Sequence, residues 1–191
     1  MGFLRHDKAF SIIELVVVII IFSIIALVAT LKFGPYDAMK VDGAARKIAS
    51  DIAYAQILAM TRSYNDTPTQ YIVINFNPTN DTYNITRTRP SQPVTDPFTK
   101  ENFFIVDFKT GTYQGVDIVS ANFIGTNLSN IYNSLCLTVF RGIPQACNDA
   151  GGFYWPRGDL SSDGEINISY HGKTRIIRVT RQTGRVYVLN Q

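Results

Sequence analysis

The sequence predicts an α+β protein in which a long amino-terminal helix packs on a carboxyl-terminal antiparallel β-sheet domain. An apolar run with a single ionisable residue fills residues 10–31, and helical periodicity continues to residue 62. Alternating apolar and polar residues, separated by turn-forming residues, recur through 63–191. A length of 191 residues suits one modest domain with an appendage and is short for a typical two-domain enzyme.

Composition excludes several classes of protein. Lys and Arg number 18 against 15 Asp and Glu, so the chain lacks the strong basic excess of a dedicated nucleic-acid binder. Two cysteines alone cannot form a four-ligand zinc site, and with only two histidines a metal site of ordinary spacing is hard to assemble, so we expect no metal and no cofactor. No nucleophile, base and acid fall into a known catalytic spacing, and no phosphate-binding loop is present. We therefore expect no enzymatic activity.

The apolar run from Phe10 to Leu31 is long enough to cross a membrane. Its 22 residues would form roughly 33 Å of helix, against a hydrocarbon core of about 30 Å. A cleaved secretory signal would have a shorter apolar region, whereas this chain continues into another helical pattern. The sequence predicts a short polar leader at residues 1–9 and a retained transmembrane helix at 10–31.

Glu14 is the only ionisable residue in this run. A carboxylate at the bilayer centre costs roughly 2.5–3.5 kcal/mol on insertion scales. One interpretation places Glu14 among the lipid headgroups, because it lies one turn into the run. The other supplies a partner: cutting the chain between Ala9 and Phe10 would create an α-amino group about 6 Å away along the helix axis. In a bundle of helices, that amine could neutralise the carboxylate of a neighbouring subunit.

The segment Lys8–Leu15 (KAFSIIEL) and the apolar run after it resemble the class III processing signal of type IV pilins and type II secretion pseudopilins. The resemblance implies cleavage between Ala9 and Phe10 by a prepilin peptidase, N-methylation of Phe10, and a role for Glu14 in subunit docking. The family usually has glycine where this chain has Ala9. The implied partners are other pilins or pseudopilins in a filament, the prepilin peptidase, the inner-membrane assembly platform and membrane lipid.

The region after the apolar run predicts an amphipathic continuation of the helix over residues 32–62. Gly34-Pro35 predicts a kink at its start. Beyond this pair, apolar residues recur at three- and four-residue spacing, namely Val41, Ala44, Ala45, Ile48, Ile52, Ala55 and Ala59. Gln70–Phe76 and Asp81–Thr86 then read as a hairpin. The segment Ile48–Met60 and this hairpin resemble the GspH/FimT group of pseudopilins and minor pilins.

The β-rich region at residues 63–191 is expected to be extracytoplasmic. Thr88–Asn102 holds three prolines and predicts a surface loop, and further strands are expected at Phe103–Phe108 and Gly115–Phe123. The last strands are predicted as an antiparallel meander, at Glu165–Tyr170, Thr174–Thr180 and Arg185–Leu189. The turn before the last strand, with Gly184-Arg185, again resembles the GspH/FimT group.

Cys136 and Cys147 could form one disulfide. It would close a short loop between a strand and its neighbour and contribute roughly 3 kcal/mol in the chain-entropy model. The alternative is a pair of buried free thiols. The positive charges flanking the apolar run do not decide its orientation, but a disulfide needs an oxidising compartment. We therefore expect a single-pass protein of the bacterial inner membrane with its carboxyl-terminal domain in the periplasm or outside the cell.

Five basic residues lie within thirteen positions near the carboxyl terminus: Lys173, Arg175, Arg178, Arg181 and Arg185. Some members of the FimT branch bind DNA through arginines of this region, so the resemblance implies a DNA contact for these residues. Tyr187 stands where the family's Gly-Arg-x-Arg pattern has its second arginine. Strand alternation also points Arg175 and Arg178 to opposite faces. The alternative is a solvated sheet edge that its charges protect against pairing.

The sequence therefore indicates a filament subunit, processed by prepilin peptidase. Within that interpretation it predicts a minor pilin or pseudopilin that initiates or caps a type IV pilus or a type II secretion pseudopilus. A DNA-binding minor pilin for natural transformation is the first alternative. A plain single-span membrane-anchored protein outside any filament is the second.

Overall fold

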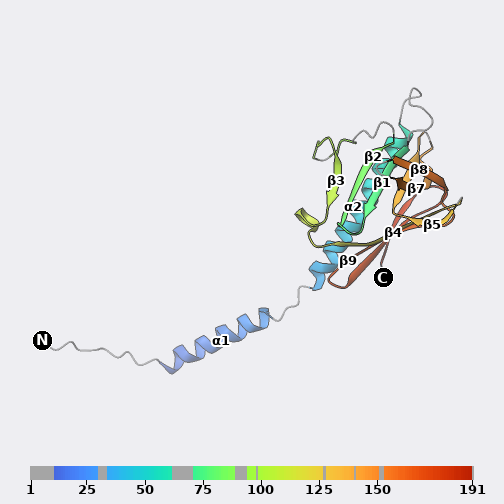
Figure 1. The fold of residues 1–191 in the computed structure, drawn as a ribbon. Coiled ribbons are helices and arrows are strands. Elements are labelled where there is room, and N and C mark those ends of the chain that lie inside the picture. The colour runs from blue at the N-terminus through green and yellow to red at the C-terminus, as the bar shows by residue number, and fades with distance from the viewer. Residues whose placement is uncertain are drawn as a thin grey trace. The chain divides into compact units, whose positions relative to one another are not determined.

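The computed structural model describes residues 11–29, 34–61, 71–88, 94–97, 99–126, 128–139, 141–150 and 153–190. The chain divides into two compact units, Met1–Gly34 and Pro35–Gln191, and each is described by itself. The predicted leader and the residues on either side of the predicted cleavage point, Ala9 and Phe10, lie outside the described residues. Figure 1 shows the elements in chain order.

The first unit contains helix α1, Ile12–Ala29. Ser11 caps its amino terminus: the Ser11 carbonyl accepts the Glu14 N–H at 3.0 Å, and the Ser11 hydroxyl lies 3.4 Å from the Ile13 nitrogen. Glu14, three residues after the cap, gives the Ser-x-x-Glu spacing of a capping box. The side chains described along α1, at residues 12–27, are exposed. Within the described part of the chain, no helix combines the length and the apolar character needed to cross a membrane.

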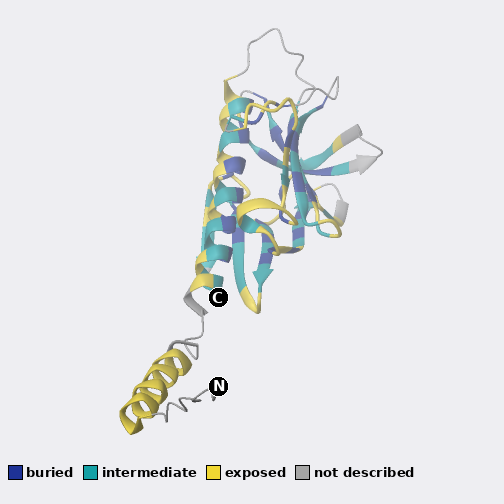
Figure 2. Cartoon of the chain, turned by 90° about the vertical axis from the view of Figure 1, so that its left-hand side faces the viewer, coloured by how far each residue is buried: buried dark blue, intermediate teal, exposed yellow. Residues whose placement is uncertain are grey.

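Helix α2 is Gly34–Met60, and all of it except Gly34 belongs to the second unit. Pro35 lies in its first turn, where the missing backbone N–H has no intrahelical partner to lose. The seven apolar residues that predicted one helix face are at most 1 % exposed. Figure 2 shows this buried side of α2 turned toward the strands and its opposite side exposed. The kink predicted at Gly34-Pro35 falls where the two units join, and the geometry of that junction is not described.

The strands form two antiparallel sheets. The first sheet has the order β3 (Phe104–Asp107), β2 (Thr82–Arg87), β1 (Tyr71–Asn77), β6 (Ser134–Thr138), β7 (Pro144–Ala150) and β8 (Phe153–Asp159). The second has the order β11 (Val186–Asn190), β10 (Lys173–Val179), β9 (Gly164–Tyr170), β4 (Asp117–Gly125) and β5 (Leu128–Tyr132). A short 3₁₀ helix, η1 (Gly111–Tyr113), precedes β4.

The structure confirms the α+β class, the β1–β2 hairpin and the carboxyl-terminal β9–β10–β11 meander. It differs from the expectation in dividing the strands between two sheets. The strands β5 to β8 were not predicted as regular elements. In β6, four consecutive residues are buried, so the strand shows no apolar–polar alternation. The pairing of β7 with β8 contains a register shift, and β8 contains a proline.

Helix α2 contacts both sheets, which places the core between the helix and the inner sheet faces (Figure 1). Tyr54 of α2 stacks on Phe104 of the first sheet, with ring centroids 6.1 Å apart. Lys40 of α2 lies over the ring of Tyr170 in the second sheet, 4.3 Å from its centroid. The alanines of the buried face, which include Ala44, Ala55 and Ala59, let the helix backbone approach the strands closely.

Candidate functional site

The described part of the amino-terminal segment leaves Glu14 exposed in the first turn of α1. Among the described residues of this chain, no basic group pairs with its carboxylate. The predicted partner, the α-amino group created at Phe10, lies outside the described residues. The carboxylate is therefore accessible to a group from another molecule.

The predicted disulfide between Cys136 and Cys147 is present. It joins the neighbouring strands β6 and β7, and the two Cα atoms are 5.7 Å apart. Both cysteines are almost fully buried, and Val73 of β1 packs beside them. The covalent link joins the two strands of a hairpin in the middle of the first sheet. The sequence predicted this arrangement, a short loop closed between a strand and its neighbour.

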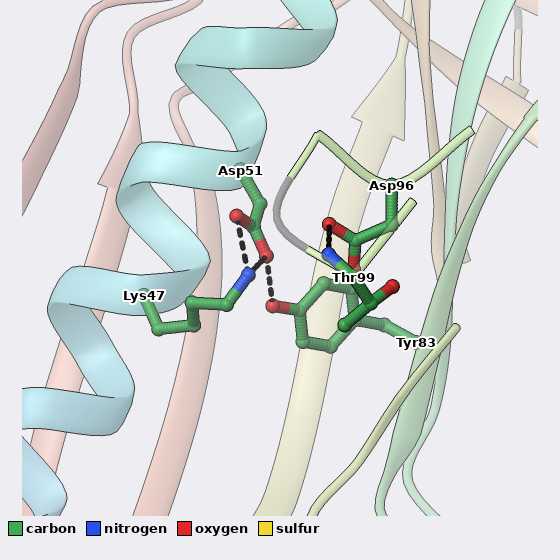
Figure 3. Close-up of polar contacts among 5 residues, drawn as sticks. All are labelled: Lys47, Asp51, Tyr83, Asp96 and Thr99. Carbon is green, nitrogen blue, oxygen red and sulfur yellow. Dashed lines mark hydrogen bonds and ion pairs between the residues drawn. The ribbon is translucent and has the colours of Figure 1, made fainter. Parts of the chain in front are cut away.

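A buried polar cluster joins α2 to the first sheet (Figure 3). Lys47 Nζ donates to both carboxylate oxygens of Asp51, at 2.7 and 2.6 Å. The Tyr83 hydroxyl of β2 donates to Asp51 Oδ2 at 2.5 Å. Asp51 is 2 % exposed and Tyr83 is 1 % exposed, so both groups are almost fully removed from water. We call Lys47, Asp51 and Tyr83 the helix–sheet cluster.

Burial raises the pKa of the Asp51 carboxyl above its usual value, although the hydrogen bonds from Lys47 and Tyr83 act in the opposite direction. Burial also raises the pKa of the Tyr83 phenol well above its usual value, and the adjacent Asp51 adds to this rise. A buried carboxylate is costly without donors. Lys47 lies on the same helix as Asp51, so the Tyr83 hydroxyl is the donor that ties α2 to β2, and a displacement of the helix would cost Asp51 this hydrogen bond.

The segment around Asp96 lies next to the helix–sheet cluster (Figure 3). Asp96 is 6 % exposed, and its carboxylate accepts the Thr99 N–H at 3.3 Å. Its backbone N–H donates to the Glu101 carbonyl at 3.0 Å. The charge of Asp96 contributes to the rise in the pKa values of both Asp51 and Tyr83. The loop predicted before β3 is thus held by a second buried acid.

The two arginines of β10 point to opposite faces of the second sheet, as strand alternation predicted. Arg175 faces α2, where its Nε lies 3.4 Å from Asp42 Oδ1. Arg178 is on the other face, where its Nη2 lies 2.8 Å from Glu165 Oε1 of β9. Each guanidinium therefore has a carboxylate partner within the fold.

The remaining basic residues of the predicted DNA contact lie on exposed turns and strand ends. Lys173 opens β10 and is exposed. Arg181 donates through Nη1 to the Ser161 carbonyl at 3.1 Å. The Arg185 guanidinium lies 5.6 Å from the centre of the Tyr187 ring. The structure thus distributes the five basic side chains over two sheet faces and one turn.

Two glycine turns, one from each sheet, close on the last turns of α2. Gly184 has a φ of 67°, and a Cβ there would collide with the Gln56 amide nitrogen. Gly142 has a φ of 62°, and a Cβ there would lie 3.2 Å from Met60 Cγ. The positive φ favours glycine in both turns, and a larger residue would require the Gln56 or the Met60 side chain to move. The sequence indicated the turn at Gly184 but not its contact with the helix.

Other sites receive little support within the described residues. No group of three or more His, Cys, Asp or Glu side chains there could hold a metal ion. The helix–sheet cluster itself was missed from the sequence. The available signal was Asp51, an acid placed between Ile48 and Ile52 on the buried face of α2, four residues after Lys47.

A family model for the prokaryotic N-terminal methylation motif matches residues 4–30. That motif is the signature of type IV pilins and pseudopilins. The amino-terminal segment of this chain carries that signature, which points to a structural rather than an enzymatic protein, processed at its amino terminus and assembled with other pilins. Neither the curated proteins nor the solved structures that were compared with this chain gave a match.

Proposed function

We propose that this chain is a minor pilin or pseudopilin, a structural or initiating subunit of a type IV pilus or a type II secretion pseudopilus. The observation that carries the proposal is the methylation motif at residues 4–30. The α+β architecture supports it, because a long helix on antiparallel sheets is what the resemblance to the GspH/FimT group implies.

The proposed location is the bacterial inner membrane, with the sheets in the periplasm or outside the cell. The apolar run from Phe10 to Leu31 would span the bilayer, and its length in the sequence matches a hydrocarbon core of about 30 Å. The disulfide between Cys136 and Cys147 supports an oxidising compartment for the second unit. The assembly platform of the inner membrane would extract the subunit from lipid into the filament.

Glu14 carries the proposed docking step. Prepilin peptidase would cut between Ala9 and Phe10 and N-methylate Phe10, which leaves a charged amine near the amino terminus of the helix. The described residues offer no basic partner to the exposed Glu14 carboxylate, which supports pairing with the amine of an adjacent subunit. Helix packing among neighbours replaces lipid contacts without a net hydrophobic gain, so this pair would set the register.

Mass spectrometry of the protein recovered from membranes and from sheared filaments tests the processing step. We expect a mature chain that begins at N-methylated Phe10. Recovery of the intact Met1 terminus alone would support a plain membrane anchor and contradict the proposal.

Substitution of Glu14 tests the docking step separately. We expect Glu14→Gln, which keeps the shape and removes the charge, to leave membrane insertion intact and to reduce the amount of the subunit in filaments. Ser23→Ala is the matched control on the same helix, because its hydroxyl donates to the Ile19 carbonyl of that helix at 2.8 Å. Equal filament incorporation of both variants would remove Glu14 from the assembly step.

A further inference from the structure

Strand β11 is an unprotected edge of the second sheet. Sheet edges expose unpaired backbone groups, and proteins usually block them with short strands, charges, prolines or bulges. Among the edge strands of the described sheets, β3 has four residues and ends in Asp107, β8 contains Pro156, and β5 pairs with a register shift. The sequence of β11 is Val-Tyr-Val-Leu-Asn, and all five residues pair with β10 in regular register. It contains none of these blocking features.

The backbone of β11 presents its free groups at defined residues. The Thr180 N–H donates to the Arg185 carbonyl at 2.9 Å, just before the strand begins. Hydrogen-bonded and non-hydrogen-bonded pairs alternate along antiparallel strands. Counting from the hydrogen-bonded pair Thr180–Arg185, the next residues of β11 that bond to β10 are Tyr187 and Leu189. The N–H and C=O groups of Val186, Val188 and Asn190 then point away from β10, toward the open edge.

A groove of about 640 Å³ runs between this edge and α2. Ala38, Met39 and Ala49 line its helix side, and Val186 and Val188 line its strand side. Both valines are only half-buried, although their partners in β10, Val179 and Ile177, are fully buried. The helix therefore covers the sheet up to β10 and leaves the apolar side of β11 partly uncovered.

An ion cluster gives the groove a net positive charge. Asp42 accepts from Arg46 at 2.9 Å and lies 3.4 Å from Arg175. The hydrogen bond from Arg46 lowers the pKa of Asp42, which therefore stays ionised. Two guanidinium groups share one carboxylate, and the Arg46 side chain is 74 % exposed. An acidic group of a binding partner would neutralise the second of these two guanidinium charges.

We propose that β11 is a docking site for an extended, acidic segment of a partner protein, which adds to the second sheet as a further strand. Its backbone would bond to Val186 and Val188, its alternate apolar side chains would enter the groove, and one acidic side chain would meet Arg46. A second copy of this chain fits less well, because two net positive ion clusters would meet at the joint. The inference goes beyond filament assembly and does not depend on it.

Binding of a designed peptide to the full chain in detergent micelles tests this proposal. The probe is a fluorescent peptide of alternating valine and threonine with one central glutamate, and its control carries lysine in place of the glutamate. We expect saturable binding of the glutamate peptide by fluorescence anisotropy, with at least tenfold weaker binding of the lysine peptide. Hydrogen exchange should slow at Val186 and Val188 when the glutamate peptide is bound.

Two variants separate the backbone contribution from the charge. Val188→Pro removes an outward N–H that β10 does not use, and we expect at least a tenfold loss of binding, while Val188→Thr keeps the N–H and should bind within twofold of the parent. Arg46→Gln changes an exposed side chain and should make the two peptides bind alike. Absence of binding, unchanged binding by both Val188→Pro and Arg46→Gln, or a peptide-independent dimer through β11 would overturn the proposal.

Discussion

Tyr83→Phe tests whether the helix–sheet cluster holds α2 on the first sheet. The change removes one hydroxyl and leaves the buried ring in place, so the only interaction lost is the 2.5 Å hydrogen bond to the Asp51 carboxylate. A hydrogen bond to a charged group contributes about 1.5–3 kcal/mol. We expect the free energy of unfolding at pH 7 to fall by about 2 kcal/mol in urea titrations of the full chain, followed by near-ultraviolet circular dichroism.

The loss should depend on pH in a definite direction. Burial raises the pKa of Asp51 above its ordinary value of 3.8, so the folded protein binds this proton more tightly than the unfolded chain. The contribution of Asp51 to stability is therefore full below pH 3.8 and declines as the pH rises through its folded pKa. Tyr83→Phe removes a donor that favours the ionised form, so the decline should be larger in the variant and should extend to higher pH. Near pH 3.5 the difference between variant and parent should shrink to about 1 kcal/mol, the contribution of a bond between neutral groups.

Tyr132→Phe is the matched control. Tyr132 is half-buried against the same core, and its hydroxyl has no hydrogen-bond partner among the described residues. Its loss should change the free energy of unfolding by less than about 0.5 kcal/mol. A Tyr83→Phe effect as small as this, or one that grows at acid pH, would refute the assignment of an ionised, hydroxyl-bound Asp51.

Three further predictions follow from the second unit. Replacing Cys136 and Cys147 by serine should lower the free energy of unfolding by about 3 kcal/mol relative to the oxidised parent, and the reduced parent is the control that should match the double variant. Gly184→Ala should destabilise by about 1 kcal/mol more than Gly172→Ala, since both have positive φ but only Gly184 is blocked by Gln56; equal thermal shifts would contradict this contact. We expect the full chain in detergent to leave the mobility of duplex DNA unchanged at low salt, because its basic side chains are dispersed; a shift would support the DNA-binding alternative.

The elements with a clear local period were predictable from the sequence. The buried face of α2 followed from three- and four-residue spacing, and the β1–β2 hairpin and the final meander followed from alternation and turn residues. The division into two sheets was not predictable in this way. It depends on long-range pairing, such as β1 with β6 and β4 with β9, which no local pattern records.

The residues of the candidate sites also divide into those that a local pattern predicts and those that depend on long-range contacts. The disulfide was predictable because only two cysteines exist and one short loop separates them. The partners of Arg175 and Arg178 were not, because Asp42 and Glu165 come from different elements and meet only in the folded state. Tyr83 was missed for the same reason, since its hydroxyl reaches Asp51 across 32 positions of chain.

The contacts of α2 have a mechanical consequence. Asp37 lies 3.4 Å from His171, Asp51 bonds to Tyr83, and Gln56 reaches the Thr183 carbonyl at 3.4 Å. These attachments are spread over about 28 Å of helix and lead to both sheets. A pull applied along the helix axis would load them in parallel rather than one after another, so the second unit would resist such a pull as a single body.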